Sequence, residues 1–120
     1  MKAVIDTNIL VDFLQGHAAA RQELARYQNP AISVITWMEV MAGAAPATEA
    51  GTRAFLNGFD LLGIDAPTAE QAVQLRRSHR IKLPDAIIWA TARVSQSILV
   101  TRNSRDMDPT DPGIRIPYTI

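Results

Sequence analysis

The sequence of 120 residues predicts an α/β fold with a central, mainly parallel sheet of four to five strands. Short apolar runs recur along the chain, and each has the size of a buried strand in a parallel sheet. Longer stretches with helical spacing of apolar residues separate these runs. Strands that alternate with helices indicate a sheet covered by helices on both faces. The length favours one domain spanning residues 1–120.

Turn and cap residues divide the first half of the chain into elements. After the first apolar run, Asp6 can cap a helix that ends at Gly16. Asn29-Pro30 ends the next helix. Thr36, with Glu39 three residues later, matches a capping box, so we expect Thr36 to begin a helix. The expected elements are a strand at 3–5, helices at 7–14 and 18–27, a strand at 31–35, a helix from 36 to about 43, and a helix at 48–59.

The second half repeats this alternation. Pro84 and Asp85 open a helix that is apolar on nearly every side, so we expect it to be central. Pro117 cannot donate a backbone hydrogen bond, which places the last strand at an edge of the sheet. The expected elements are a strand at 61–64, helices at 68–80 and 84–95, and strands at 97–101 and 114–118.

Composition excludes several classes of protein. With 48% hydrophobic and 20% charged residues, the chain has the composition of a compact folded domain rather than a disordered one. It contains no cysteine, which excludes disulfides, thiolate metal sites and a cysteine nucleophile. No apolar run approaches the roughly 18 residues of a membrane span, and the first residues do not match a signal peptide. We therefore expect a cytoplasmic protein without a membrane partner.

Four acidic residues occupy junctions between an apolar run and a turn or helix. In an α/β sheet the loops after the strands converge on one edge, so acids far apart in sequence can meet there. Each acid alone is explained by helix capping or by loop exposure. Capping, however, is served equally well by Ser or Thr, and like-charged carboxylates repel one another unless a cation neutralises them. The four residues are Asp6, Glu39, Asp85 and Asp106.

The segments that carry these acids resemble the four motifs of PIN-domain nucleases, and most of all the VapC toxins of bacterial toxin–antitoxin pairs. The resemblance covers residues 3 to 106 in the order of the family. The four segments are Val4-Ile-Asp-Thr-Asn-Ile-Leu, Thr36-x-x-Glu39, Leu83-Pro-Asp-Ala-Ile-Ile-Trp-Ala-Thr-Ala and Leu99-Val-Thr-Arg-Asn-Ser-Arg-Asp.

This resemblance implies a Mg²⁺- or Mn²⁺-dependent endoribonuclease with a three-layer α/β/α sandwich, a homodimer, and a cognate antitoxin that blocks the site. The first three acids of the family fall on Asp6, Glu39 and Asp85. The fourth falls on Asp106, although Asn103 occupies a position where many relatives carry an acid. Asp108 is a weaker substitute, so the fourth ligand and the metal count stay open.

The residue types agree with metal-dependent phosphodiester hydrolysis. Mg²⁺ prefers one or two carboxylates plus retained waters, and it activates water while neutralising phosphate charge. Neither histidine lies in an acidic motif, and such a mechanism needs no histidine base. Four neighbouring polar side chains are expected to hydrogen-bond the carboxylates or a water, although turn and cap chemistry explains them equally well. They are Thr7, Asn8, Thr101 and Asn103.

A run of basic residues lies immediately before Asp85. Cations at the end of a helix favour its dipole, so the run has a structural explanation as well as a phosphate-binding one. Together with Arg102 and Arg105, which follow the strand expected at 97–101, this run would surround the acids with positive charge and hold an RNA backbone. These candidate RNA contacts are Arg76, Arg77, Arg80, Lys82, Arg102 and Arg105.

Two other functions compete with the nuclease. A phosphoacceptor receiver domain has a similar length and fold class, but it needs an acid pair after the first strand and an aspartate that closes the third. Here Thr7 follows Asp6, and the segment around Asp65 is a poor match. A catalytically inactive PIN-like interaction module is the second alternative, and the intact Asp6, Glu39 and Asp85 argue against it.

Overall fold

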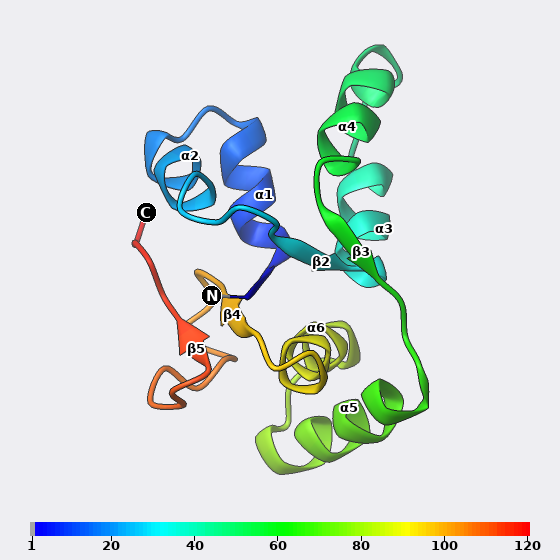
Figure 1. Cartoon of the computed structure of the whole chain (residues 1–120), viewed down its shortest axis with the longest axis vertical. Helices are drawn as coiled ribbons and strands as arrows, with labels where there is room; N and C mark the ends of the chain where they lie inside the picture. Colours follow the sequence, from blue (N-terminus) through cyan, green and yellow to red (C-terminus); the bar gives the residue numbers. More distant parts are fainter. Residues whose placement is uncertain (1) are drawn as a thin grey trace.

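The computed structural model describes residues 2–120, and these contain a five-stranded, entirely parallel sheet (Figure 1). The strand order is β3-β2-β1-β4-β5. The elements in chain order are β1 (Ala3–Ile5), α1 (Thr7–Leu14), α2 (Ala18–Leu24), β2 (Ala31–Ser33), α3 (Val34–Ala42), η1 (Pro46–Thr48), α4 (Glu49–Leu56), β3 (Asp60–Leu62), α5 (Ala66–His79), α6 (Leu83–Val94), β4 (Ile98–Val100) and β5 (Ile114–Arg115).

The order of the strands creates a switch point at the centre of the sheet. The chain builds outward from β1 through β2 to β3, and then returns to the other side of β1 for β4 and β5. β1 pairs with β4 in register, with Ile5 opposite Val100. The loops after β1 and β4 therefore leave the sheet in opposite directions, which opens a crevice at the carboxyl ends of these two strands. Sheets of this kind bind their ligands in that crevice.

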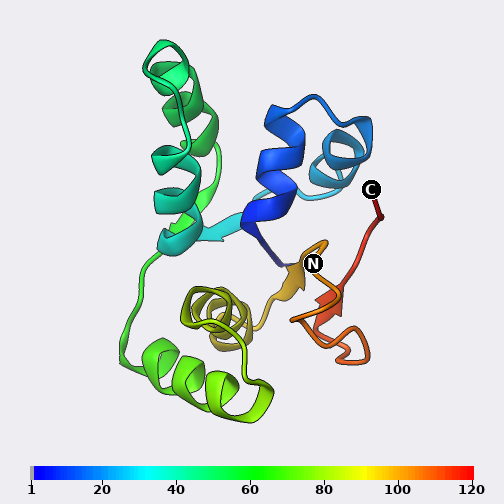
Figure 2. The ribbon, with the colours of Figure 1, turned by 180° about the vertical axis from the view of Figure 1, so that it is seen from behind.

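Alternation along the short strands supplies the two hydrophobic faces. Val4 and Leu99 belong to one buried cluster, whereas Ile5 and Val100 belong to the other. Figures 1 and 2 show α5 and α6 on the first face of the sheet and α1 to α4 on the second. This is the three-layer α/β/α arrangement that the alternation of strands and helices predicts, and the expected edge position of the last strand is confirmed.

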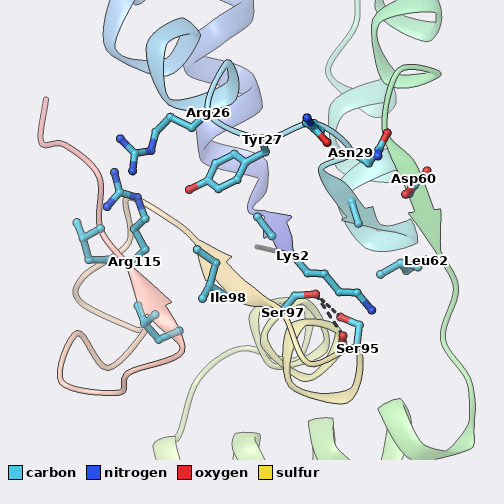
Figure 3. Close-up of a pocket in the computed structure, with 15 residues that line it drawn as sticks. Lys2, Arg26, Tyr27, Asn29, Asp60, Leu62, Ser95, Ser97, Ile98 and Arg115 are labelled. Atoms are coloured by element: carbon cyan, nitrogen blue, oxygen red, sulfur yellow. Dashed lines mark hydrogen bonds between the residues drawn. The ribbon is translucent and has the colours of Figure 1, made fainter.

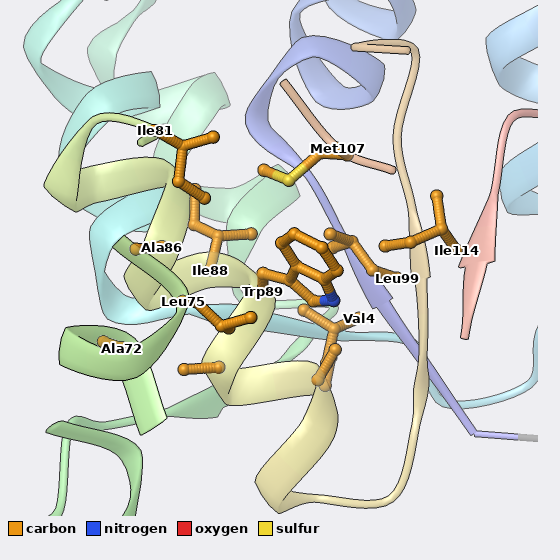
Figure 4. Close-up of a cluster of buried hydrophobic side chains, with 13 residues drawn as sticks. Val4, Ala72, Leu75, Ile81, Ala86, Ile88, Trp89, Leu99, Met107 and Ile114 are labelled. Carbon is orange, nitrogen blue, oxygen red and sulfur yellow. The ribbon is translucent and has the colours of Figure 1, made fainter. Parts of the chain in front are cut away.

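The prediction that the helix after Pro84 is central is confirmed. Trp89 on α6 is fully buried and lies at the middle of the cluster in Figure 4, between Leu75 of α5 and Leu99 of β4. The burial of this face fixes the rotation of α6 about its axis. Because Asp85 lies in the first turn of the same helix, the packing of α6 also fixes the place of that carboxylate.

One local prediction was wrong. Thr36 does not begin α3: the hydroxyl of Ser33 accepts a hydrogen bond from the backbone N–H of Ile35 (3.1 Å), so Ser33 is the cap and β2 ends two residues earlier than expected. Pro84 and Asp85 open α6 as predicted, with Lys82 at the cap position and Asp85 as the third helical residue. Asp6 does cap α1, and Gly16 follows that helix with a φ of 86°.

The opposite edge of the sheet carries a large cavity. It has a volume of about 1210 Å³ and lies at the amino ends of the strands, where Lys2, Tyr27 and Arg115 line it (Figure 3). None of the four candidate acids lines it. Its size therefore does not make it the candidate active site, which the switch point places at the other edge. No helix within residues 2–120 has the length and apolar character needed to cross a membrane.

Candidate active site

Asp6 lies in the crevice between β1 and β4 and is only 3% exposed. One carboxylate oxygen accepts hydrogen bonds from the Thr101 hydroxyl (2.7 Å) and the Asn8 side-chain amide (3.3 Å). The other oxygen accepts from the backbone N–H of Thr7 (2.7 Å). These neighbours come from the first turn of α1 and from the end of β4. They fix the orientation of the carboxylate, and two of the four polar side chains named from the sequence, those of Thr101 and Asn8, contact it.

Glu39 reaches the same region from α3. The Thr7 hydroxyl donates to its carboxylate (2.7 Å) and also contacts the hydroxyl of Thr36 (3.0 Å). Thr36 is buried, whereas Glu39 is exposed. The Thr36-x-x-Glu39 pair therefore acts through Thr7 rather than as a helix cap, and it ties α3 to the start of α1.

Asp106 lies in the loop after β4 and is held by Asn103. The side-chain amide of Asn103 donates to Asp106 (3.2 Å), and the backbone N–H of Asp106 donates back to Asn103 (3.2 Å). The Asn103 backbone N–H in turn donates to Thr101 (3.0 Å), next to Asp6. Asp108 has a different role, because its carboxylate accepts hydrogen bonds from the backbone N–H and the hydroxyl of Thr110 in a local turn.

Electrostatics show that the four acids act on one another. Burial raises the pKa of Asp6 to about 6, the hydrogen bonds from Thr101 and Thr7 oppose this shift, and the charges of Asp85 and Glu39 add to it. Burial also raises the pKa of Asp85, and the charges of Asp106 and Glu39 raise it further, against a smaller opposing effect of Lys82. Such mutual repulsion is expected between neighbouring carboxylates, and a cation bound among them would relieve it.

None of these four acids forms an ion pair with any residue in 2–120. Nor are any three acidic or histidine side chains in that range already closed into a metal-ligand set. The four acids offer hard oxygen donors, which would have to draw closer together to share one ion. Mg²⁺ and Mn²⁺ favour oxygen ligands, and Mg²⁺ usually keeps several of its waters, so the residues present fit such an ion.

The basic residues divide into two groups. Arg76 donates to the backbone carbonyl of Ile81 (2.6 Å) and so helps to end α5, and Arg102 is paired with Asp12. The remaining four are exposed and form no ion pair within residues 2–120. Lys82 is near enough to lower the pKa of Asp85, and Arg105 borders a hollow of about 410 Å³ together with Asn8 and Asn103. The four exposed residues are Arg77, Arg80, Lys82 and Arg105.

Asp12 and Tyr118 lie beside the site but were not predicted from the sequence. Asp12 is buried on α1 and accepts hydrogen bonds from Arg102 and from the Tyr118 hydroxyl. A signal was present, because Asp12 interrupts the apolar run from Ile9 to Leu14, and a buried charge needs a partner. The partner itself could not be read from the sequence, since Tyr118 is 106 residues away.

The comparisons with known proteins agree with this geometry. The PIN domain family matches residues 3–110. The chain is 34% identical over 124 residues to Ribonuclease VapC19 of Mycobacterium tuberculosis, covering 96% of this chain and 98% of that protein.

A receiver domain would need an aspartate after its third strand to accept the phosphate. Asp65 lies there but caps α5 instead, where its carboxylate accepts a hydrogen bond from the backbone N–H of Thr68 (2.9 Å).

Solved structures show the same fold. A chain of a toxin–antitoxin complex from Klebsiella pneumoniae superimposes with a TM-score of 0.93 and 45% identity, covering 98% of this chain and 99% of that one. A chain of DNA-bound VapBC from Salmonella typhimurium superimposes with a TM-score of 0.79 and 25% identity, covering 96% of each. The chain therefore belongs to the PIN-domain family and, within it, to the VapC ribonucleases.

Proposed function

We propose that this chain is a toxin endoribonuclease that hydrolyses RNA phosphodiester bonds with a bound divalent cation, Mg²⁺ or Mn²⁺. The observation that carries the proposal is the set of four neighbouring carboxylates at the switch point of the sheet, none of which has a cationic partner within residues 2–120. Membership of the VapC ribonucleases supports RNA as the substrate.

The acids differ in what they would contribute. Asp6 and Asp85 would hold the cation directly, because both are held on rigid elements and their repulsion is relieved by a positive charge. Glu39 is exposed and hydrogen-bonded to Thr7, so it would ligate the ion or orient the attacking water. Asp106, which Asn103 holds, would complete the set. The bound cation would activate a water and neutralise charge on the phosphate oxygens.

The neighbouring hydroxyls and amides preorganise these carboxylates. Thr101 and Asn8 hold one oxygen of Asp6 and the Thr7 backbone holds the other, so little rearrangement is needed when a substrate arrives. Lys82, which acts on Asp85, and Arg105, which borders the hollow beside Asn8 and Asn103, would supply positive charge for the RNA backbone. Arg77 and Arg80 extend this charge along the end of α5.

Partners follow from the relatives. Solved structures of similar proteins are toxin–antitoxin complexes, which supports a cognate antitoxin that covers the site of this chain. The homodimer implied by the family is a further expectation. Sedimentation equilibrium of the purified chain, alone and with the product of the adjacent reading frame, tests both.

An RNA cleavage assay tests the proposed function. The purified chain is expected to cleave RNA with Mg²⁺ or Mn²⁺ and to leave no 2′,3′-cyclic phosphate, because water rather than the 2′-hydroxyl attacks the phosphorus. The resemblance to PIN-domain nucleases implies that the P–O3′ bond breaks, which leaves a 5′-phosphate and a 3′-hydroxyl. Excess EDTA should abolish cleavage, and added Mn²⁺ should restore it. Cleavage that persists in EDTA contradicts the metal mechanism. A folded chain that binds its antitoxin but never cleaves RNA is instead an inactive PIN-like interaction module.

A further inference from the structure

A buried carboxylate, Asp12, forms an ion pair with Arg102, whose side chain is 34% exposed, and Asn8 links this pair to the candidate active site. Asp12 on α1 is 2% exposed, and Arg102 grips both of its oxygens, with the guanidinium Nε 2.8 Å from one and Nη2 3.0 Å from the other. The Tyr118 hydroxyl donates a third hydrogen bond (2.8 Å) from the C-terminal segment. A two-point arginine–carboxylate contact of this kind fixes geometry as well as charge.

Arg102 is also tied to α1 through its backbone. Its N–H donates to the side-chain oxygen of Asn8 (3.0 Å), and Asn8 lies one helical turn before Asp12. The same Asn8 side chain donates to Asp6 and to Thr101. Arg102 is therefore held against α1 at two points, by its side chain at Asp12 and by its backbone at Asn8. The second of these residues, Asn8, also hydrogen-bonds Asp6 in the acidic site.

The loop held in this way carries the fourth acid. Beyond Arg102, Asn103 donates its backbone N–H to Thr101, and its side chain and backbone hold Asp106. Asp106 itself forms no ion pair within residues 2–120, and the other ion pair of this loop in that range, Arg93–Asp111 (2.8 Å), lies five residues farther along the chain. Movement of Arg102 would thus be passed to Thr101, Asn103 and Asp106 together.

We propose that Asp12 and Arg102 are positioning residues, forming a clamp that holds the loop after β4 in the geometry required for RNA cleavage. In this role the guanidinium of Arg102 binds the protein and not the RNA, although its place beside the acids suggests a phosphate contact. The inference rests on the proposed ribonuclease function. Its physical basis is that groups supporting a ligand orient it, and their loss typically costs about 10- to 100-fold in activity or metal affinity.

A second ion pair in the molecule provides a matched control. Glu23 on α2 is also buried, is also gripped at two points by an arginine, Arg115 (2.7 and 2.9 Å), and also accepts from a tyrosine, Tyr27 (2.6 Å). Within residues 2–120, the side chains of Glu23, Arg115 and Tyr27 form no hydrogen bond to Asp6 or Asp106. The backbone carbonyl of Arg115 accepts a hydrogen bond from the N–H of Thr101 (3.0 Å), and a side-chain substitution leaves that bond in place. Substitution here therefore removes the same side-chain chemistry while the contacts from Arg102 to the loop after β4 stay intact.

Single-turnover cleavage at saturating RNA separates the two pairs. We expect Arg102→Ala and Asp12→Ala each to lower the rate per folded molecule by about 10- to 100-fold. RNA affinity and its dependence on salt should stay at the wild-type values. Arg115→Ala should leave the rate per folded molecule unchanged. Equal rates for Arg102→Ala and wild type, or equal losses for Arg102→Ala and Arg115→Ala, overturn the inference.

The competing role, an RNA contact, gives the opposite pattern. Arg102→Ala would then weaken binding and reduce the slope of log affinity against log salt by about 0.7. Asp12→Ala would release the guanidinium, so RNA affinity would stay the same or rise. Observing this pair of results excludes the clamp.

Milder variants and a readout without catalysis keep the test decisive if the alanine variants do not fold. Tyr118→Phe removes one hydrogen bond to Asp12, and we expect a loss of less than about 10-fold, against no loss for Tyr27→Phe. Amide hydrogen exchange in Arg102 to Met107 should accelerate in Tyr118→Phe and Arg102→Ala, and not in the controls. If wild type never cleaves RNA, the proposed function fails while the exchange data still test the clamp. If wild type cleaves and exchange is unchanged, the clamp alone is wrong.

Discussion

Asp6 and Asp12 lie at the two ends of α1, and both are almost completely buried, yet their surroundings have opposite effects on their charge. Burial raises the pKa of Asp6 to about 6, and two further carboxylates add to the shift. Burial also opposes the charged form of Asp12, but hydrogen bonds from Arg102 and Tyr118 outweigh it and lower the pKa of that carboxyl. The difference between the two ends is the presence of a cation.

Glu23 repeats the arrangement of Asp12, and Asp85 repeats that of Asp6. The Arg115 hydrogen bonds lower the pKa of Glu23 against the effect of burial, whereas burial and two acidic neighbours raise the pKa of Asp85. Asp12 and Glu23 thus form ion pairs with arginines, whereas Asp6 and Asp85 at the switch point form no ion pair within residues 2–120. Carboxylates left in this state are typical of functional sites, and here they favour an external cation.

The largest expected effect is on cleavage when an unpaired acid is neutralised. Asp6→Asn and Asp85→Asn should each lower the cleavage rate by at least about 100-fold, beyond the range for residues that only support a ligand. Asp60→Asn, at an exposed acid on the amino end of β3, is the matched control and should cleave at the wild-type rate. His79→Ala should also retain the chemistry. A folded Asp85→Asn variant with a near wild-type rate contradicts the site assignment.

Removal of the cation from a paired acid should instead destabilise the fold. In Arg115→Ala, Glu23 stays buried and keeps only the more distant Arg26 (3.8 Å) as a cationic partner, so the free energy of unfolding should fall by roughly 1–3 kcal/mol, with solvent access to Arg115 limiting the loss. The double variant Arg115→Ala/Glu23→Gln should recover part of this loss, because the buried charge that lost its two-point partner is gone. Urea unfolding of wild type and both variants measures these free energies. An Arg115→Ala variant as stable as wild type contradicts the comparison.

The paired acids also predict a pH dependence of stability. The pKa of Glu23 in the folded protein lies below its ordinary value of 4.5, so its charge stabilises the fold above that value, and this stabilisation disappears as the pH falls through the folded pKa. The difference in unfolding free energy between wild type and Glu23→Gln should therefore be constant from neutral pH to about pH 5 and shrink below it. A difference that grows on acidification has the wrong sign.

The smallest expected effects concern the basic residues around the acids. Lys82→Ala, Arg105→Ala, Arg77→Ala and Arg80→Ala should each weaken RNA binding modestly and reduce the salt slope by about 0.7 where a phosphate contact is lost. Arg76→Ala should mainly lower stability, because its guanidinium holds the Ile81 carbonyl. RNA affinity across a salt series measures the slopes. Unchanged slopes in all of them place the RNA elsewhere on the molecule.

Much of the fold could be predicted because the periodicity of apolar residues and the positions of glycine and proline indicate the same element boundaries. Gly16 and Pro84 mark element boundaries in the sequence and do so in the structure. The start of α3 was mispredicted because Ser33 and Thr36 both suit a cap, and only the structure shows that Ser33 Oγ accepts the bond. The position of the acids near one edge was predictable from strand topology, since three of them follow strand ends or begin a helix.

The electrostatic division between the acids could not be predicted from the sequence. Nothing local to Asp12 or Arg102 indicates that they meet, because the partners are 90 residues apart. For the same reason Arg102 and Arg105 appear equivalent in the sequence, although only Arg102 has a carboxylate partner within residues 2–120. Long-range pairing of charges depends on the packed arrangement, and short-range patterns carry little information about it.

Thermal unfolding of wild type and Asp85→Asn, with and without Mn²⁺, tests most directly whether the unpaired acids form a cation site. Without metal, Asp85→Asn should be as stable as wild type or more stable, because one repelling charge is removed. Mn²⁺ at about 100 times its dissociation constant should stabilise wild type by about 2.7 kcal/mol and the variant far less. Equal stabilisation of both proteins by Mn²⁺, or a metal-free variant that is clearly less stable than wild type, would contradict the account.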